Sequence, residues 1–300
     1  MTARCVTSSV VGSYPIVVPG SELMAQYFAG ENVSWYPYIA DAVGDMTEAG
    51  IEVVSDGQTR DPFIQLFTRR LGGCRVRART EVVGPIVYRG GITVDDVQVV
   101  RRLVSPSTKI VGVLTGPFTL MKSCIDLFYH DERACCLGFA EALRQEAAAL
   151  SWFVDEVSID EPWFANELPA YAEEAIGVIS EGSSCPMRLH VCGDVSRIVH
   201  RLVGMPVDML SHEFKASPKL FDAYLQYPSE MGMCIGSVRS DDVRVESVEE
   251  VVAHLRRAEE VFGRRVVQVA PDCGQRMLPR EVAFAKLRCL QQAKEVVYGG

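Results

Sequence analysis

The sequence has no uninterrupted apolar run of the roughly 20 residues that a membrane-spanning helix needs, although 48% of its residues are hydrophobic. Its first residues also lack the long apolar core of a secretory signal peptide. Acidic residues outnumber basic ones, 39 against 30, which gives a formal net charge of −9. A nucleic-acid partner would need a basic face, so this charge argues against one. We therefore expect a cytoplasmic protein that binds neither membranes nor nucleic acids.

No internal repeat, low-complexity tract or linker rich in proline and serine divides the 300 residues. This absence predicts one domain that spans residues 1–300. No Gly-x-Gly-x-x-Gly fingerprint follows an early strand, which disfavours the alternative of an open, doubly wound sheet. Ten cysteines without an export signal are expected to be thiols and not disulfides.

Eight short, β-branched runs alternate with longer stretches in which apolar residues recur at spacings of three and four. Such alternation predicts parallel strands joined by helices, and eight units predict a single (β/α)₈ barrel. Residues Val82–Val94 indicate a β-hairpin inserted after the second strand. The predicted strands are Ser9–Ser13, Ile51–Ser55, Lys109–Leu114, Val154–Asp160, Met187–Val191, Val207–Ser211, Met231–Gly236 and Arg265–Ala270. The predicted helices are Tyr38–Ala49, Phe139–Val154, Leu168–Ser180, Ser247–Phe262 and Arg280–Val297, with Asp131 and Ser247 as N-caps.

Polar residues cluster where the predicted strands end, which in a barrel is the face that carries the active site. His190 and Cys192 share one face of a strand, because side chains two residues apart point the same way. Glu213 or its neighbour His212, and Cys273 at the last strand, can join them around one metal ion. Taken singly, each residue also has a structural explanation: a hydrogen-bonded core histidine, a helix-capping glutamate or a packed cysteine.

These motifs, in this order and spacing, resemble the catalytic barrel of cobalamin-independent methionine synthase, and in particular its short archaeal single-barrel forms. The resemblance covers nearly the whole chain. It rests on residues 11–15 (VGSYP), 56–60 (DGQTR), 116–119 (GPFT), 159–162 (IDEP), His190, Cys192, Glu213 and 271–274 (PDCG).

The resemblance implies a zinc ion held by His190, Cys192, Glu213 and Cys273, and a methyl transfer to the thiol of L-homocysteine that forms L-methionine. It also implies that Asp160 binds the substrate ammonium and that Ser13 and the backbone at Val11 bind its carboxylate. Asp160 and Glu161 are the expected catalytic carboxylates. Gln58 stands where many relatives have a glutamate, so it can bind the substrate only as an uncharged group.

Two aromatic groups of the long, folate-dependent enzymes are missing here. The residues directly after Thr119, 120–123 (LMKS), include no tryptophan, and residues 236–242 contain no histidine that could protonate a pterin. We also expect no counterpart of the N-terminal folate-binding barrel of those enzymes. The resemblance therefore implies a methylated corrinoid protein or methylcobalamin as methyl donor, since a Co(I) corrinoid leaves without taking a proton. Methyl-tetrahydromethanopterin or methyl-tetrahydrofolate is the alternative donor.

Two further hypotheses keep the barrel but change its role. A related zinc methyltransferase could methylate another thiol such as coenzyme M, which would not need both Asp160 and Ser13. A zinc-stabilised binding barrel without turnover would have a closed shell of four protein ligands. A run of arginines is either a loop that docks the donor protein or a solvated surface: Arg69, Arg70, Arg75, Arg77 and Arg79.

Overall fold

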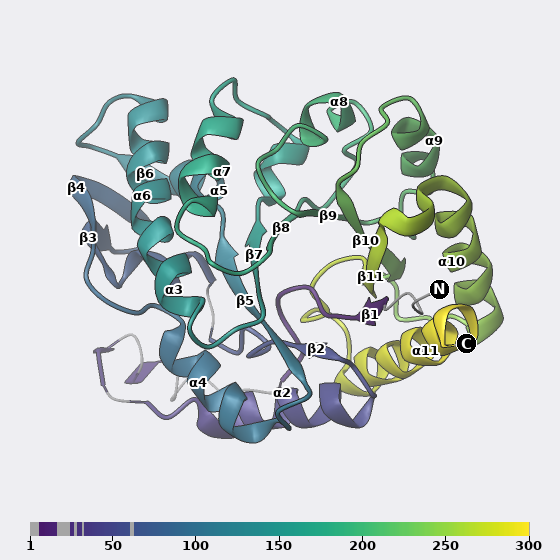
Figure 1. Ribbon diagram of the computed structural model, residues 1–300. Helices are drawn as coiled ribbons and strands as arrows, with labels where there is room; N and C mark the ends of the chain where they lie inside the picture. Colours follow the sequence, from purple (N-terminus) through teal and green to yellow (C-terminus); the bar gives the residue numbers. More distant parts are fainter. Residues whose placement is uncertain (1–5, 17–24, 27–28, 32, 61–62, 300) are drawn as a thin grey trace.

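A computed structural model describes residues 6–16, 25–26, 29–31, 33–60 and 63–299. Strands at the centre are surrounded by helices, and a small separate sheet lies at one side (Figure 1). The strands are β1 (Thr7–Ser8), β2 (Val53–Val54), β3 (Leu71–Val76), β4 (Thr80–Tyr88), β5 (Lys109–Thr115), β6 (Cys124–Asp126), β7 (Glu156–Asp160), β8 (Met187–His190), β9 (Met209–His212), β10 (Gly232–Val238) and β11 (Val266–Pro271). The helices are α2 (Tyr36–Glu48), α3 (Phe63–Thr68), α4 (Val94–Leu103), α5 (Pro117–Ser123), α6 (Glu132–Leu150), α7 (Ala172–Ser180), α8 (Val199–Leu202), α9 (Lys219–Leu225), α10 (Val248–Phe262) and α11 (Arg280–Tyr298), with 3₁₀ turns η1 (Pro162–Ala165) and η2 (Gly263–Arg265).

The central sheet has eight strands in the order β1-β11-β10-β9-β8-β7-β5-β2, and the paired strands are parallel. A parallel bridge between Ser9 and Val53 joins the two ends of this order and closes the sheet. The predicted eight-stranded barrel is therefore confirmed.

The first strand differs from its prediction. The sequence predicted Ser9–Ser13, whereas β1 comprises Thr7–Ser8 and the chain leaves the sheet after the Ser9 bridge. Residues 11–13 consequently lie beyond the end of the strand and line a cavity. The other seven strands overlap their predicted ranges.

The small sheet has the order β3-β4-β6, with β3 and β4 antiparallel and β6 parallel to β4. A hairpin after the second barrel strand is confirmed, but its predicted bounds were wrong, because residues 80–88 form one strand and pair with Leu71–Val76. The Gly84-Pro85 step is not the turn between two strands. Gly72 pairs with Val87 and Cys74 with Val82, so β4 bulges there opposite β3.

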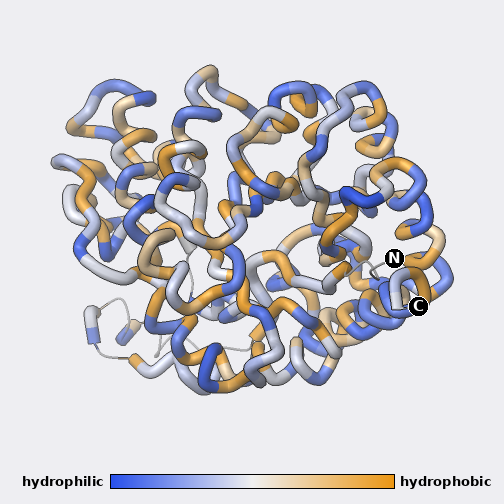
Figure 2. Tube along the Cα trace, in the orientation of Figure 1, coloured by the Kyte–Doolittle hydropathy of each residue, from blue (hydrophilic) through white to orange (hydrophobic). Residues whose placement is uncertain are grey.

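The helices cover the outside of the barrel, and hydrophilic and hydrophobic residues alternate along them (Figure 2). Both predicted N-caps are confirmed: the side chain of Asp131 accepts a hydrogen bond from the Ala134 amide, and Ser247 forms a capping box with Glu250. Apolar residues of α6, α10 and α11 pack against the strands in one large core. In the described part of the chain, no helix combines the length and apolar character needed to cross a membrane.

Candidate active site

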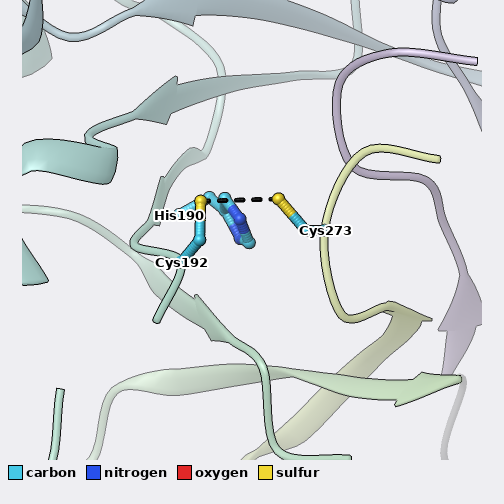
Figure 3. A group of neighbouring side chains, drawn as sticks. All are labelled: His190, Cys192 and Cys273. Atoms are coloured by element: carbon cyan, nitrogen blue, oxygen red, sulfur yellow. Dashed lines mark hydrogen bonds between the residues drawn. The ribbon is translucent and has the colours of Figure 1, made fainter. Parts of the chain in front are cut away.

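The imidazole of His190 and the thiols of Cys192 and Cys273 meet at the carboxyl ends of β8 and β11. One ligand atom from each residue lies within 4.8 Å of the others. The two sulfurs are 3.4 Å apart, and Figure 3 shows Cys273 reaching the cluster from the side opposite Cys192, with the imidazole beside the line between them. Imidazole nitrogen and cysteine sulfur are the donors that zinc and related ions prefer. This cluster, the His-Cys-Cys cluster, can therefore hold a metal ion.

The imidazole of His190 is oriented as a metal ligand would be. Its Nδ1 lies 3.0 Å from the hydroxyl of Ser211, while its Nε2 is buried and has no hydrogen-bond partner among the described residues. Burial, together with the charge of Arg188 and the nearby His212, lowers the pKa of His190 well below its usual value. A neutral ring that is hydrogen-bonded at one nitrogen leaves the lone pair of the other for a metal.

The two cysteines are held by different parts of the chain. The backbone amide of Cys273 donates to the hydroxyl of Ser240, and that hydroxyl donates to the Cys273 carbonyl. The hydrogen bond from Cys273 and burial raise the pKa of the Cys192 thiol well above its usual value. A bound cation would oppose this effect, because coordination stabilises the thiolate form.

His212 is the last residue of β9, and Glu213 directly follows it. His212 stacks on Tyr224, its Nδ1 lies 3.0 Å from the Val191 carbonyl, and it is outside the group of ligand atoms that lie within 4.8 Å of one another. Glu213 lies close enough to Cys192 to raise the pKa of the Cys192 thiol. The Glu213 carboxylate accepts a hydrogen bond from the Gly193 amide and is not part of the His-Cys-Cys cluster. Glu213 as the fourth ligand stays a prediction.

The loop that carries Glu213 is tied to the loop that carries Cys273. The carboxylate of Asp272 accepts hydrogen bonds from the amides of Lys215 and Ala216 at 3.0 and 2.7 Å. Because Asp272 precedes Cys273 in the chain, these bonds fix the position of one loop relative to the other. Asp272 is thus a structural support of the cluster that the sequence analysis did not identify.

A cavity of about 320 Å³ opens beside the His-Cys-Cys cluster. The structure brings all four predicted substrate-binding positions to its wall, although they come from strand ends far apart in the sequence. Its lining residues are Val11, Gly12, Ser13, Gln58, Thr115, Asp160, Pro162, His190, Cys192, Cys273, Gly274, Arg276 and Met277. The sequence analysis missed Arg276 and Met277, which follow the PDCG motif after Gln275; Met277 is 88% exposed at the cavity's edge.

Asp160 presents a carboxylate to this cavity. Its Oδ1 accepts a hydrogen bond of 2.9 Å from the Ser158 hydroxyl, and burial raises its pKa to about 6 against the opposing effect of Arg188. Gly12, at φ +50°, lies against both Asp160 and Gln58: a Cβ there would be 2.7 Å from Gln58 Oε1 and 3.3 Å from Asp160 Oδ2. A glycine at this position therefore leaves the polar atoms accessible from the cavity.

Glu161 is not among the residues that line this cavity, and its contacts give it a structural role, so its catalytic role stays a prediction. Its carboxylate accepts hydrogen bonds from the amides of Phe118 and Thr119 at 2.8 and 2.9 Å and from the Thr119 hydroxyl at 2.6 Å. These groups form the start of α5, so the fully buried Glu161 caps that helix. Adjacent residues at the end of a strand face opposite sides, and only Asp160 faces the cavity.

Glu161→Ala is expected to lower the free energy of unfolding by about 3 kcal/mol, because it leaves two buried amides and a hydroxyl unpaired. Chemical denaturation would measure this loss, and metal content would stay unchanged in the folded protein. An unchanged unfolding free energy together with lost turnover would contradict the capping role and support a catalytic one.

The arginine run does not form one surface. Arg70 donates to the carbonyls of Gly91 and Ile92, and Arg75 pairs with Glu81 at 2.6 Å. Arg77 and Arg79 are exposed at the turn between β3 and β4. A donor-docking role of this run stays a prediction.

The fold and the cavity define an α/β-barrel enzyme with a candidate thiolate–imidazole metal centre beside a substrate-sized cavity. A family model described as the catalytic domain of cobalamin-independent synthase matches residues 6–295. The chain belongs to the cobalamin-independent methionine synthase family.

Individual relatives match along almost their whole length. The methionine synthase of Methanocaldococcus jannaschii is 31% identical over 97% of this chain and 99% of its own, and that of Methanothermobacter marburgensis is 31% identical over 95% and 98%. The fold is similar to that of a B12-independent methionine synthase from Shewanella sp. W3-18-1, with a TM-score of 0.82 over 98% of both chains at 23% identity.

Proposed function

We propose that this enzyme transfers a methyl group to the thiol of L-homocysteine and so forms L-methionine. The observation that carries the proposal is the single cavity that joins the His-Cys-Cys cluster to Asp160. Such a cavity offers one end that suits a sulfur and another that suits an ammonium. The family relatives named above are methionine synthases, and the Shewanella structure is a complex with selenomethionine.

We infer that the metal is zinc, held by His190, Cys192 and Cys273, with Glu213 as a fourth ligand. The donor set fits, because the buried His190 Nε2 has no other partner among the described residues and the two sulfurs lie beside it. When bound, zinc would supply a Lewis acid that keeps the acceptor sulfur in its thiolate form.

The protein's own residues would bind and orient the amino-acid end of the substrate. Asp160 is the anionic group of the cavity that can accept hydrogen bonds from the ammonium. Ser13 and the backbone from Val11 would donate to the carboxylate, and Gln58 would add an uncharged hydrogen bond. The amide of Gln275 donates to the Ser13 carbonyl at 2.7 Å, so the carboxylate-binding loop is fixed to the loop that bears Cys273.

For the methyl donor we propose a methylated corrinoid protein, or methylcobalamin in its place. The residues after Thr119 are the buried Leu120 and Met121 of α5, which offer no aromatic ring for a pterin to stack on. The segment after β10 carries no histidine that could protonate a leaving pterin. A corrinoid needs neither group.

A comparison of donors tests this proposal. With zinc-loaded protein and homocysteine, methylcobalamin should give methionine at least about tenfold faster than methyl-tetrahydrofolate or methyl-tetrahydromethanopterin. Mass spectrometry of the product would measure each rate. A faster reaction with either pterin would overturn the donor, whereas methylation of coenzyme M without methylation of homocysteine would overturn the acceptor.

We also infer that residues 1–300 work as one catalytic barrel in the cytoplasm. The nine cysteines in the described part of the chain are all free thiols. Free thiols suit a reducing compartment, where the cluster would stay able to bind metal.

A further inference from the structure

An arginine lies inside the barrel, directly below the cavity. Arg188 is two residues before His190 on β8 and is fully buried. Side chains at this depth of a barrel are ordinarily branched aliphatic groups that fill the interior. A buried guanidinium costs free energy unless its donors are satisfied, and a hydrophobic side chain would fill the space at lower cost. The contacts of Arg188 therefore show what the charge is used for.

Arg188 contacts groups on two other strands, β7 and β11, and in the segment that follows β1. Its Nη1 donates to the Ser9 hydroxyl at 3.1 Å and to Gln268 Oε1 at 3.0 Å. Its Nη2 donates to the Val10 carbonyl at 3.0 Å, and Glu156 balances the charge at 3.3 Å. The Val10 carbonyl directly precedes the Val11–Ser13 segment of the cavity wall.

The Nε of Arg188 is connected to Asp160 through one intervening hydroxyl. This nitrogen donates to the Ser158 hydroxyl at 3.2 Å, and that hydroxyl lies 2.9 Å from Asp160 Oδ1. An arginine can only donate, so the Ser158 oxygen accepts from it and the single hydroxyl proton points to Asp160. The hydrogen bonds therefore run from Arg188 to Ser158 and from Ser158 to Asp160. The Ser158 hydroxyl occupies Oδ1 of Asp160 and leaves Oδ2, which faces Gly12, for a ligand in the cavity.

We propose that Ser158 and Arg188 are positioning residues that make the cavity selective for thiols carrying an α-amino group. Through Ser158, Arg188 holds the Asp160 carboxylate in one orientation. Through the Val10 carbonyl, it holds the segment that would bind the α-carboxylate. The inference rests on the proposed function, because it needs an amino-acid thiol as the methyl acceptor.

Ser158→Ala removes the hydroxyl that connects Arg188 to Asp160 and changes little else. Methyl transfer is measured with L-homocysteine and with 4-mercaptobutyrate, which has the same thiol and carboxylate but no amino group. We expect the KM for homocysteine to rise about tenfold with little change in kcat, because the ammonium meets a misoriented carboxylate. For 4-mercaptobutyrate, kcat/KM should stay within about twofold of the unchanged protein.

Ser9→Ala is the matched control. It removes a buried hydroxyl that accepts a hydrogen bond from the Arg188 guanidinium, as the Ser158 hydroxyl does. The Ser9 hydroxyl, however, is not hydrogen-bonded to Asp160. We expect Ser9→Ala to leave the homocysteine KM within about twofold. Arg188→Lys, which keeps the charge but loses the forked geometry, should raise the homocysteine KM at least as much as Ser158→Ala.

Three results would overturn the inference. They are an unchanged homocysteine KM in Ser158→Ala, an equal loss with both thiols, and an equal effect of Ser9→Ala. If the unchanged protein methylates no homocysteine at all, the proposed function itself fails and this inference falls with it. Normal activity of the unchanged protein with an unaffected Ser158→Ala would remove only the positioning role.

Discussion

Replacement of Cys273 by serine should remove the metal and lower methyl transfer to homocysteine by more than about 100-fold, since changes that merely disturb the support of metal ligands already cost roughly 10- to 100-fold. Cys273 is one of only two sulfurs in the His-Cys-Cys cluster, and it alone joins β11 to β8 there. A serine hydroxyl remains protonated at neutral pH and is a poor ligand for zinc. Elemental analysis and steady-state kinetics would measure the two losses together.

Cys185→Ser provides the matched control. Its sulfur donates to the carbonyls of Ser151 and Val154, and a serine hydroxyl can make the same kind of bond away from the cavity. This variant should retain zinc and activity. If Cys273→Ser also kept about one zinc per chain and full turnover, the proposed metal centre would be wrong.

Asp160→Asn should raise the KM for homocysteine about 10- to 100-fold, because a hydrogen bond between two charged groups contributes roughly 1.5–3 kcal/mol. The change keeps the shape of the side chain but removes the negative charge that an ammonium needs. Bound zinc should be unaffected, since Asp160 is not part of the His-Cys-Cys cluster. Kinetics at varied homocysteine, with metal analysis of the same samples, would measure both quantities.

Asp155→Asn is a suitable comparison because it makes the same substitution at the other end of the same strand. Asp155 directly precedes β7, and Asp160 is the last residue of β7. Asp155 pairs with Arg101 at 2.8 Å and accepts from the Ile110 amide, far from the cavity lining. Its homocysteine KM should not change. Equal KM values for Asp160→Asn and the unchanged protein would remove Asp160 from the substrate site.

The barrel was predictable because each buried strand leaves a local signature. Runs such as Lys109–Leu114 are β-branched, bounded by turn residues and followed by helical periodicity, so their ranges needed no long-range information. The small sheet had no such signature. Gly72 and Gly73 weaken the strand signal of β3, and Gly84-Pro85 resembles a turn although it lies in the bulge of β4.

The site was predictable where strand alternation decided it. His190 and Cys192 had to share a face, and the convergence of strand ends on a barrel axis added Cys273. The same alternation separates Asp160 from Glu161, yet two adjacent carboxylates gave no local indication of which one faces inward. The supports of the site, Asp272, Ser240 and Arg188, were not predictable, because their partners are distant in the chain and unrelated by any pattern.

The contact between Gly116 and Glu161 has a consequence for how such sequences diverge. A Cβ at position 116 would lie 2.1 Å from the Glu161 Cδ, so no larger residue fits while that glutamate is present. A shorter residue at 161 would make room but leave the start of α5 without its acceptor. A larger residue at position 116 therefore requires a change at position 161 as well. The GPFT and IDEP motifs are therefore expected to change together, although Phe118 and Glu161, which are hydrogen-bonded across them, lie 43 residues apart in the sequence.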